Sequence, residues 1–272
     1  MEASDLRPLN SNVKPLQISS LGSVFYRVGR SNEDRYKLSL INDDIRMYAV
    51  FDGHGGSATA NYLRDYLDHY LALAFTGINP DDPEQVKKAL NATFLTVDKK
   101  MLDLEFFDGS TAAIVLVTPR HIYLVSTGDS RAIIYSYGIL LGQSQDSKPG
   151  NTNERMRITQ LGGNVYGNPP RVMGRLAVSR AFGDFDLKIK RGSDDYDPEG
   201  FVSVIPQIDV FIRPDNAYLL VASDGLWDVV NSSEAAEFHT NDNKAQNLIE
   251  LALSRLRSVI GIDDITIINE RI

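Results

Sequence analysis

The sequence has no cysteine among its 272 residues. This absence excludes disulfides, thiolate zinc sites, iron–sulfur clusters and every mechanism with a cysteine nucleophile. No apolar run approaches the roughly 20 residues of a membrane-spanning helix, and residues 1–15 contain no apolar core of signal-peptide length. We therefore expect no membrane association and an intracellular location. The cytoplasm is the first expectation, and a mitochondrion or other organelle is the alternative if a targeting segment has been removed.

Basic residues are outnumbered, with 28 Lys and Arg against 36 Asp and Glu, a formal net charge of −8. Nucleic acid is therefore disfavoured as the main partner, because phosphate backbones bind basic surfaces. The apolar fraction of 43% and the charged fraction of 24% are typical of a globular protein. No linker rich in Pro, Gly or Ser divides the chain. We predict a partly ordered extension over residues 1–20 and a single domain over residues 21–272, acting as a monomer.

The pattern of apolar residues predicts blocks of strands and blocks of helices. Apolar side chains recur at helical spacing over residues 58–75 and 83–104, and the short linker predicts that these two helices are antiparallel neighbours. Further helices are expected at residues 153–161, 232–239 and 244–260. Runs rich in β-branched residues predict strands at 23–26, 45–51, 111–118, 121–127, 132–137, 207–212, 218–223 and 265–269. Grouped elements of this kind indicate an α+β fold rather than βαβ alternation.

Three of these strands are separated only by the turn-like pairs Pro119-Arg120 and Gly128-Asp129. Such close spacing predicts two successive hairpins in an antiparallel sheet. Asp129 is accordingly placed in a hairpin turn.

Acidic residues gather where predicted strands end. An acid just beyond a buried strand is held rigidly while its carboxylate reaches solvent. Several such carboxylates would repel one another and raise each other's pKa unless a cation neutralised them. Oxygen ligands without Cys, and with only four His, select hard ions such as Mg²⁺ or Mn²⁺. A lone Asp-Gly pair is usually only a turn, but here four clusters follow the strand pattern and one contains a histidine: Glu33-Asp34, Asp52-Gly53-His54, Asp224-Gly225 with Asp228, and Asp263-Asp264.

Seven segments, in family order, resemble the type 2C metal-dependent serine/threonine protein phosphatases. The likeness runs from about Leu21 to the C-terminus. The matching segments are NEDR at 32–35, VFDGHGG at 50–56, GSTA at 109–112, GDSRA at 128–132, GRLAVSRAFGD at 174–184, ASDGLWDV at 222–229 and DDIT at 263–266.

The resemblance implies a four-layer α-β-β-α sandwich of two antiparallel sheets flanked by helix pairs, with a flap region around residues 165–200. It also implies two Mg²⁺ or Mn²⁺ ions and a weaker third. Asp52 resembles the carboxylate that bridges two ions. Glu33 and the Gly53 carbonyl resemble ligands of one ion, and Asp224 and Asp263 resemble ligands of the other.

Further roles follow from the same resemblance. Asp129 and Asp228 match positions used, with Asp224, for the third metal site. Asp34 matches an acid that orients metal-bound water, and His54 matches the general acid. Thr111 matches a residue close to the metal-binding acids.

Three positions depart from the family pattern. The phosphate-binding arginine usually stands four residues before the Glu matching Glu33, where this chain has Gly29. Arg30 is our candidate and Arg27 the second, while the alternative is that both are surface charges. Asp146-Ser147 stands where Asp-His is frequent, and Asp263-Asp264 stands where Asp-Asn is frequent. We assign the ligand to Asp263, although Asp264 could substitute or add charge.

The sequence thus predicts a Mg²⁺/Mn²⁺-dependent hydrolase of phosphoserine and phosphothreonine in phosphoproteins, with signalling as its context. The nucleophile would be water bridging two metal ions, since no cysteine can form a phosphoenzyme. Two alternatives stay open: an inactive pseudophosphatase scaffold on the same fold, and a hydrolase of small phosphate esters.

Overall fold

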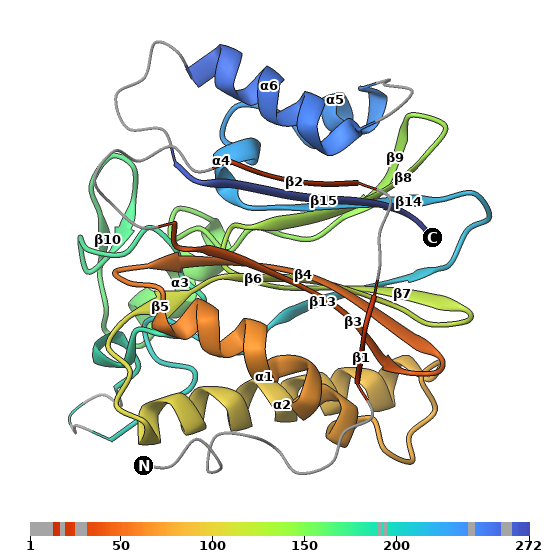
Figure 1. The fold of residues 1–272 in the computed structure, drawn as a ribbon. Helices are drawn as coiled ribbons and strands as arrows, with labels where there is room; N and C mark the ends of the chain where they lie inside the picture. The colour runs from red at the N-terminus through yellow and green to blue at the C-terminus, as the bar shows by residue number, and fades with distance from the viewer. Residues whose placement is uncertain are drawn as a thin grey trace.

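The computed structural model of the chain describes residues 13–16, 20–24, 32–189, 192, 195–238, 243–256 and 263–272. The described elements form four layers, with two antiparallel sheets stacked in the middle and helices on both outer faces (Figure 1). This arrangement confirms the predicted α+β sandwich.

The first sheet has the strand order β1-β3-β4-β6-β7-β13, with β5 and β12 attached at the end of β4. The second sheet has the order β2-β15-β14-β8-β9. The strands of the first sheet are β1 (Lys14–Pro15), β3 (Asp34–Asn42), β4 (Ile45–His54), β5 (Gly109–Ser110), β6 (Ala112–Val117), β7 (His121–Thr127), β12 (Phe182–Gly183) and β13 (Gln207–Ile212). Those of the second are β2 (Ser20–Val24), β8 (Arg131–Ser136), β9 (Ile139–Gln143), β14 (Tyr218–Ala222) and β15 (Ile265–Arg271).

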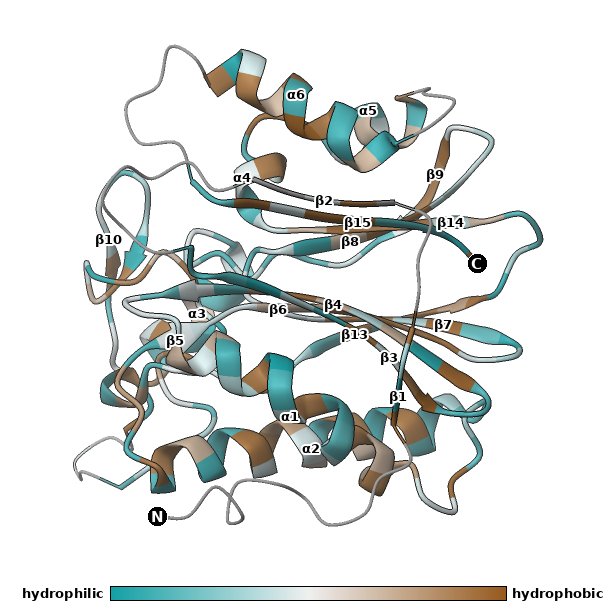
Figure 2. Cartoon of the chain, viewed as in Figure 1, coloured by the Kyte–Doolittle hydropathy of each residue, from teal (hydrophilic) through white to brown (hydrophobic). Residues whose placement is uncertain are grey.

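Helices α1 (Ala58–Ala74) and α2 (Pro83–Asp103) cover the outer face of the first sheet. The outer face of the second sheet carries α4 (Asp224–Trp227), α5 (Ser232–Glu237) and α6 (Lys244–Leu256). Figure 2 shows hydrophobic residues alternating with hydrophilic ones along α1, α2 and α6, as expected of helices that cover a sheet with one face. None of the helices in the described ranges has the length and hydropathy needed to cross a membrane.

Local sequence accounts for α2 in detail. Asp82 is the N-cap, and its carboxylate accepts hydrogen bonds from the backbone N–H groups of Glu84 and Gln85. Pro83 occupies the first turn, where its missing N–H costs nothing. The predicted stripe is fully buried against the sheet and comprises Val86, Leu90, Phe94, Val97 and Met101. Truncating a buried phenylalanine such as Phe94 to alanine typically costs about 3–5 kcal/mol.

The predicted hairpin at Gly128-Asp129 is wrong. Strand β7 pairs with β6 and β13 in the first sheet, whereas β8 pairs with β14 and β9 in the second. The three residues between them, 128–130, therefore cross from one sheet to the other. Gly128 makes the crossing with φ +105°, and a Cβ there would lie 2.5 Å from the Thr111 side chain. The hairpin between β6 and β7 is confirmed.

Other boundaries differ from the prediction. Strands β1, β3 and β9 were not predicted, and β2 begins at Ser20 rather than at residue 23. In β3 only some residues are apolar, and the strand is recognisable chiefly by its pairing with β4. Helix α5 ends at Glu237, before the predicted end at residue 239, because Phe238 is an extended C-cap residue. Helix α6 is described to Leu256, so its predicted continuation to residue 260 lies outside the described residues.

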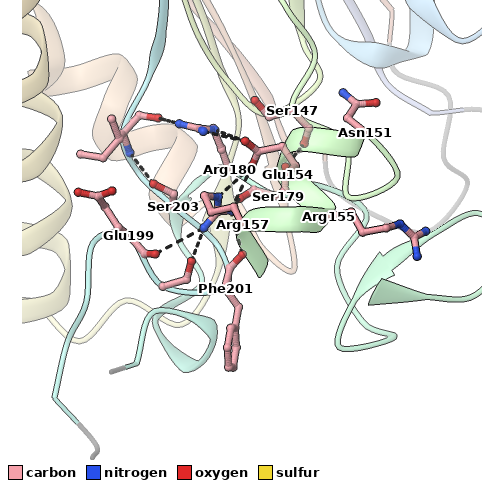
Figure 3. A network of polar contacts seen from close by, with 12 residues as sticks. Ser147, Asn151, Glu154, Arg155, Arg157, Ser179, Arg180, Glu199, Phe201 and Ser203 are labelled. Carbon is pink, nitrogen blue, oxygen red and sulfur yellow. Dashed lines mark hydrogen bonds and ion pairs between the residues drawn. The ribbon is translucent and has the colours of Figure 1, made fainter. Parts of the chain in front are cut away.

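The described residues between 152 and 205 form an irregular segment beside the sandwich, containing α3 (Thr152–Gln160), β10 (Val165–Tyr166), β11 (Arg171–Val172) and the short 3-10 helix η2 (Phe185–Leu187). A buried ion-pair network fixes this segment (Figure 3). Glu154 accepts from Arg180 at 2.7 Å and from Arg157 at 3.1 Å. Arg157 also donates to the carbonyl oxygens of Ser179 and Gly200 at 2.9 and 2.6 Å. The network joins α3 to the middle of the flap region, at residues 179–180, and to its C-terminal end at Gly200.

Candidate active site

The centre of the site is the end of β4. Asp52 lies opposite Asp34 in the β3–β4 ladder, which places the two carboxyl-bearing residues side by side. The Asp52 backbone is held on its other edge by Thr111, which donates its N–H to the Asp52 carbonyl at 2.9 Å and accepts the Asp52 N–H on Oγ1 at 3.2 Å. Thr111 Oγ1 is in turn 2.7 Å from Ser130 Oγ. The predicted proximity of Thr111 to the acids is therefore observed.

Gly53 packs directly against the backbone of Glu33, at a distance that leaves no space for a side chain. The Gly53 N–H donates to the Glu33 carbonyl at 3.2 Å, and a Cβ on Gly53 would lie 2.8 Å from that oxygen. Asp264 fixes the same segment, since its Oδ2 accepts the Glu33 N–H at 3.0 Å. Asp264 is thus a structural link as well as an additional charge at the site.

The second sheet supplies Asp224 and Asp263. Asp224 is the first residue of α4, which follows β14. The next residue, Gly225, packs so closely on the segment around Asp264 that a Cβ on Gly225 would lie 2.3 Å from the Asp264 carbonyl oxygen. Ser223 joins this corner to the first sheet by donating its hydroxyl to Asp34 Oδ2 at 2.7 Å. The Asp263 carboxylate accepts the Asp264 N–H at 3.0 Å.

Asp129 and Asp228 both form an ion pair with the same lysine side chain. Lys148 Nζ lies 3.4 Å from a carboxylate oxygen of each. Asp129 is buried, whereas Asp228 is exposed. Sequence reasoning did not single out Lys148, although it lies two residues after Asp146.

The carboxyl groups of this cluster hold protons more tightly than isolated ones. Desolvation, followed by the negative charges of Asp34, Asp224 and Asp129, raises the pKa of Asp52 well above its ordinary value. Desolvation and neighbouring acids do the same for Asp224, which shares a hydrogen bond with the Asp52 side chain. Burial raises the pKa of Asp34 to about 7, against the opposing hydrogen bond from Ser223. These shifts are those of acids gathered without a compensating charge.

The residues fit a divalent cation in donor type and charge. One carboxylate oxygen in each of Asp34, Asp224 and Asp264 is buried without a hydrogen-bond partner among the described residues. The donors are carboxylates and a backbone carbonyl, the ligands that Mg²⁺ and Mn²⁺ prefer. In the described part of the chain no three His, Asp or Glu side chains are already drawn together as a ligand group. A bound cation would compensate the negative charge of ionised Asp52 and Asp224.

His54 forms a pair that sequence reasoning missed. Its Nε2 lies 2.7 Å from Asp184 Oδ2, 130 positions along the chain. Burial alone would lower the pKa of His54, but the charge and hydrogen bond of Asp184 outweigh it and raise that pKa. The backbone leaves room for this contact only because Gly109 has no side chain, since a Cβ there would lie 2.2 Å from Asp184 and 2.3 Å from His54. Asp184 ends the segment 174–184 that carried the family resemblance, which is the signal that could have identified it.

The two remaining departures have different outcomes. Ser147 is fully buried, and its backbone donates to the Gly128 carbonyl at 2.7 Å while its own carbonyl accepts from the Ser179 N–H and hydroxyl, both at 2.8 Å. Ser147 therefore joins the crossing between the sheets to the flap region. Arg27 and Arg30 lie outside the described residues, so the choice between them stays a prediction.

Comparisons with known proteins agree with this fold. A family model for protein phosphatase 2C matches residues 27–259. Protein phosphatase 1B of Bos taurus is 36% identical over 212 residues, covering 72% of this chain and 43% of that protein. Probable protein phosphatase 2C 52 of Oryza sativa subsp. japonica is 37% identical over 250 residues, covering 87% and 48%. A mitochondrial rice relative, probable protein phosphatase 2C member 13, is 35% identical over 236 residues, covering 82% and 61%.

Solved structures share the fold. A serine-threonine phosphatase 2C from Toxoplasma gondii superposes with a TM-score of 0.77 at 22% identity, covering 97% of this chain and 99% of that one. A sex-determining protein of C. elegans superposes with a TM-score of 0.73 at 21% identity, covering 96% and 64%.

The layered sandwich with acids from both sheets at one end is therefore a phosphatase fold. The chain belongs to the protein phosphatase 2C family, whose members are metal-dependent serine/threonine phosphatases. It spans 43% to 61% of the length of the three curated relatives just described.

Proposed function

We propose that the chain is an active Mg²⁺- or Mn²⁺-dependent phosphatase of phosphoserine and phosphothreonine in proteins. The observation that carries the proposal is the cluster of acids from four separate segments, with buried carboxylate oxygens that lack partners among the described residues. The cluster argues against an inactive scaffold that binds no metal, because the repulsion between gathered carboxylates would be left uncompensated in such a fold. The proposal includes an intracellular monomer, in the cytoplasm or in an organelle.

In this proposal Asp52 would help to hold both of two divalent ions, Glu33 and the Gly53 carbonyl would hold one of them, and Asp224 and Asp263 would hold the other. Two divalent ions held there would lower the pKa of bound water and neutralise charge on the phosphoryl oxygens. A third, more weakly bound ion would be held by Asp129, Asp228 and Asp224. It would compete with the Lys148 ammonium for the carboxylates of Asp129 and Asp228. Asp34, held by Ser223, would accept a hydrogen bond from the attacking water.

His54 supplies the proton for the leaving group. A serine or threonine alkoxide is a poor leaving group unless it is protonated as its bond to phosphorus breaks. Asp184 holds the His54 ring in place and favours its protonated form, so it acts as a positioning residue. Arg30, or Arg27, remains our proposal for binding the phosphate.

Substitution of the central acids tests the proposal. Asp52→Asn or Asp224→Asn should lower phosphate release from a phosphothreonine peptide by orders of magnitude, with the thermal unfolding transition retained. Asp43→Asn is the matched control, since the Asp43 side chain is 95% exposed in the β3–β4 turn. Near-normal turnover by both site variants would contradict the proposal, and no turnover by the wild type in the presence of bound Mn²⁺ would favour the inactive scaffold.

A further inference from the structure

A cavity of about 570 Å³ opens beside His54 and Asp184. Its walls combine aromatic and aliphatic side chains with charged ones. None of the residues assigned to metal binding lines it, although the pair His54 and Asp184 beside them does. The residues that matter for its chemistry are Phe106, Phe107, Arg175, Leu176, Phe185 and Asp186.

One wall displays an exposed aromatic ring on a rigid support. Phe107 is 95% exposed. The residue before it, Phe106, packs edge-on against Tyr62 with ring centroids 5.6 Å apart. The residue after it, Asp108, caps α1 by accepting the N–H groups of Ala58 and Thr59 at 2.6 and 3.1 Å. The contacts of Phe106 and Asp108 thus fix the backbone on both sides of Phe107 while its ring stays exposed to solvent. Burying this ring against a ligand would be favourable.

A further part of the lining comes from the flap region, at residues 175–187. Phe185 is partly buried and packs edge-on against Tyr196 at 6.1 Å, while Leu176 packs on the separate core of that region. An ion pair of 2.5 Å between Arg175 and Asp186 lies at the same wall. The cavity therefore presents apolar surface with a charged rim, as specificity pockets do.

We propose that this cavity is a subsite for a bulky apolar side chain next to the phosphorylated residue of a protein substrate. The inference rests on the proposed function. Because His54 protonates the leaving oxygen, and that oxygen remains attached to the peptide, the peptide must lie on the His54 side of the phosphoryl group. The cavity on that side is larger than a threonine side chain needs, and its walls offer aromatic contacts to a neighbouring residue.

Charge complementarity narrows the substrate further. Three acids line the cavity, namely Asp108, Asp184 and Asp186. Only two cationic groups line it with them, since Arg175 pairs with Asp186 and the protonated ring of His54 pairs with Asp184, so the lining keeps a net negative charge. An acidic neighbour of the phosphorylated residue would meet this negative charge, so the subsite selects apolar over acidic neighbours.

The test compares three phosphothreonine peptides that differ only in carrying Leu, Gly or Glu on both sides of the phosphothreonine. With Mn²⁺ present, the wild type should show kcat/KM at least about tenfold higher for the Leu peptide than for the Gly peptide. The Glu peptide should be the poorest of the three. Phe107→Ala should bring the Leu-to-Gly ratio close to 1, and Phe107→Leu should retain part of the preference. Ile212→Ala is the control, because Ile212 is an 81% exposed apolar residue at the far end of β13, about 20 Å along the sheet from Thr127.

Each outcome decides between the two proposals. Equal kcat/KM for the Leu and Gly peptides in the wild type, or an unchanged ratio in Phe107→Ala, would overturn the subsite while leaving the phosphatase intact. If the chain turns over none of the peptides and no aryl phosphate, the proposed function fails instead. The subsite is then tested by the fluorescence anisotropy of the same labelled peptides, where equal Kd values for Leu and Gly would overturn it.

Discussion

The pair formed by His54 and Asp184 gives the sharpest prediction for a single side chain. Asp184→Asn replaces a carboxylate with an amide of the same shape and removes one negative charge 2.7 Å from His54 Nε2. Asp184 has φ +51°, a left-handed conformation that asparagine tolerates well, so the backbone should be unchanged. The substitution therefore isolates the charge from the fold.

The expected magnitude follows from the contact. An opposite charge within about 4–6 Å moves a pKa by about 1–3, and each unit corresponds to about 1.4 kcal/mol. The Asp184 charge is the main factor that holds the pKa of His54 above its ordinary value, against the desolvation that lowers it. Asp184→Asn should therefore lower the pKa of His54 by about 2. At pH 8 the protonated fraction of His54 should then fall by up to about a hundredfold.

Two assays check this prediction. In metal-free protein, an NMR titration of the His54 ring should show the lower pKa, with His121 as an internal reference. In Mn²⁺-loaded protein at pH 8, turnover of a phosphothreonine peptide should fall by about 10- to 100-fold. Turnover of 4-nitrophenyl phosphate, whose leaving group needs no proton, should fall far less. An unchanged His54 pKa, or equal losses on the two substrates, would refute the reasoning.

Two further predictions concern stability. The pKa of Lys244 is lowered by desolvation to about 8 from 10.5, so the folded protein binds fewer protons than the unfolded chain between these values, and its free energy of unfolding should rise with pH through that window. Lys244→Met should therefore stabilise the fold below pH 8 by at most about 3 kcal/mol, reduced by the loss of the Lys244 contacts with the Tyr135 ring and the Ala236 carbonyl. Urea denaturation from pH 7 to 10.5 should show that the difference in free energy of unfolding between variant and wild type shrinks as the pH rises. A difference that stays constant would contradict the prediction. Gly225→Ala should cost about 1–3 kcal/mol and weaken Mn²⁺ binding in calorimetry, because its Cβ would lie 2.3 Å from the Asp264 carbonyl oxygen. Gly150→Ala, whose nearest neighbour would be a Pro170 side-chain carbon at 3.2 Å, should do neither, and similar losses in both variants would count against the explanation.

Local patterns in the sequence were sufficient wherever the structure is local. The buried stripe of α2 and its Asp82 cap follow from spacing and from one polar residue before a proline. The acids at Asp52 and Asp224 were identifiable because Asp52 ends the apolar run of a buried strand, Asp224 follows another, and each precedes a glycine that the packing requires.

Pairings between distant segments could not be predicted from the same patterns. A short glycine-containing turn reads alike in a hairpin and in a crossing between sheets, and only the partners of β7 and β8 distinguish the two at Gly128. The contact of His54 with Asp184 joins positions 130 residues apart, and no periodicity records it. Lys148 was missed for the same reason, since its role depends on Asp129, in the crossing before β8, and on Asp228, at the end of α4.

Metal-dependent release of phosphate from a phosphothreonine peptide tests the central claim most directly. The account predicts no release in EDTA, full restoration by Mn²⁺ or Mg²⁺, and loss of that restoration in Asp52→Asn at unchanged thermal stability. Release that persists in EDTA, or that Asp52→Asn leaves intact, would contradict the assignment of the acidic cluster as a catalytic metal centre.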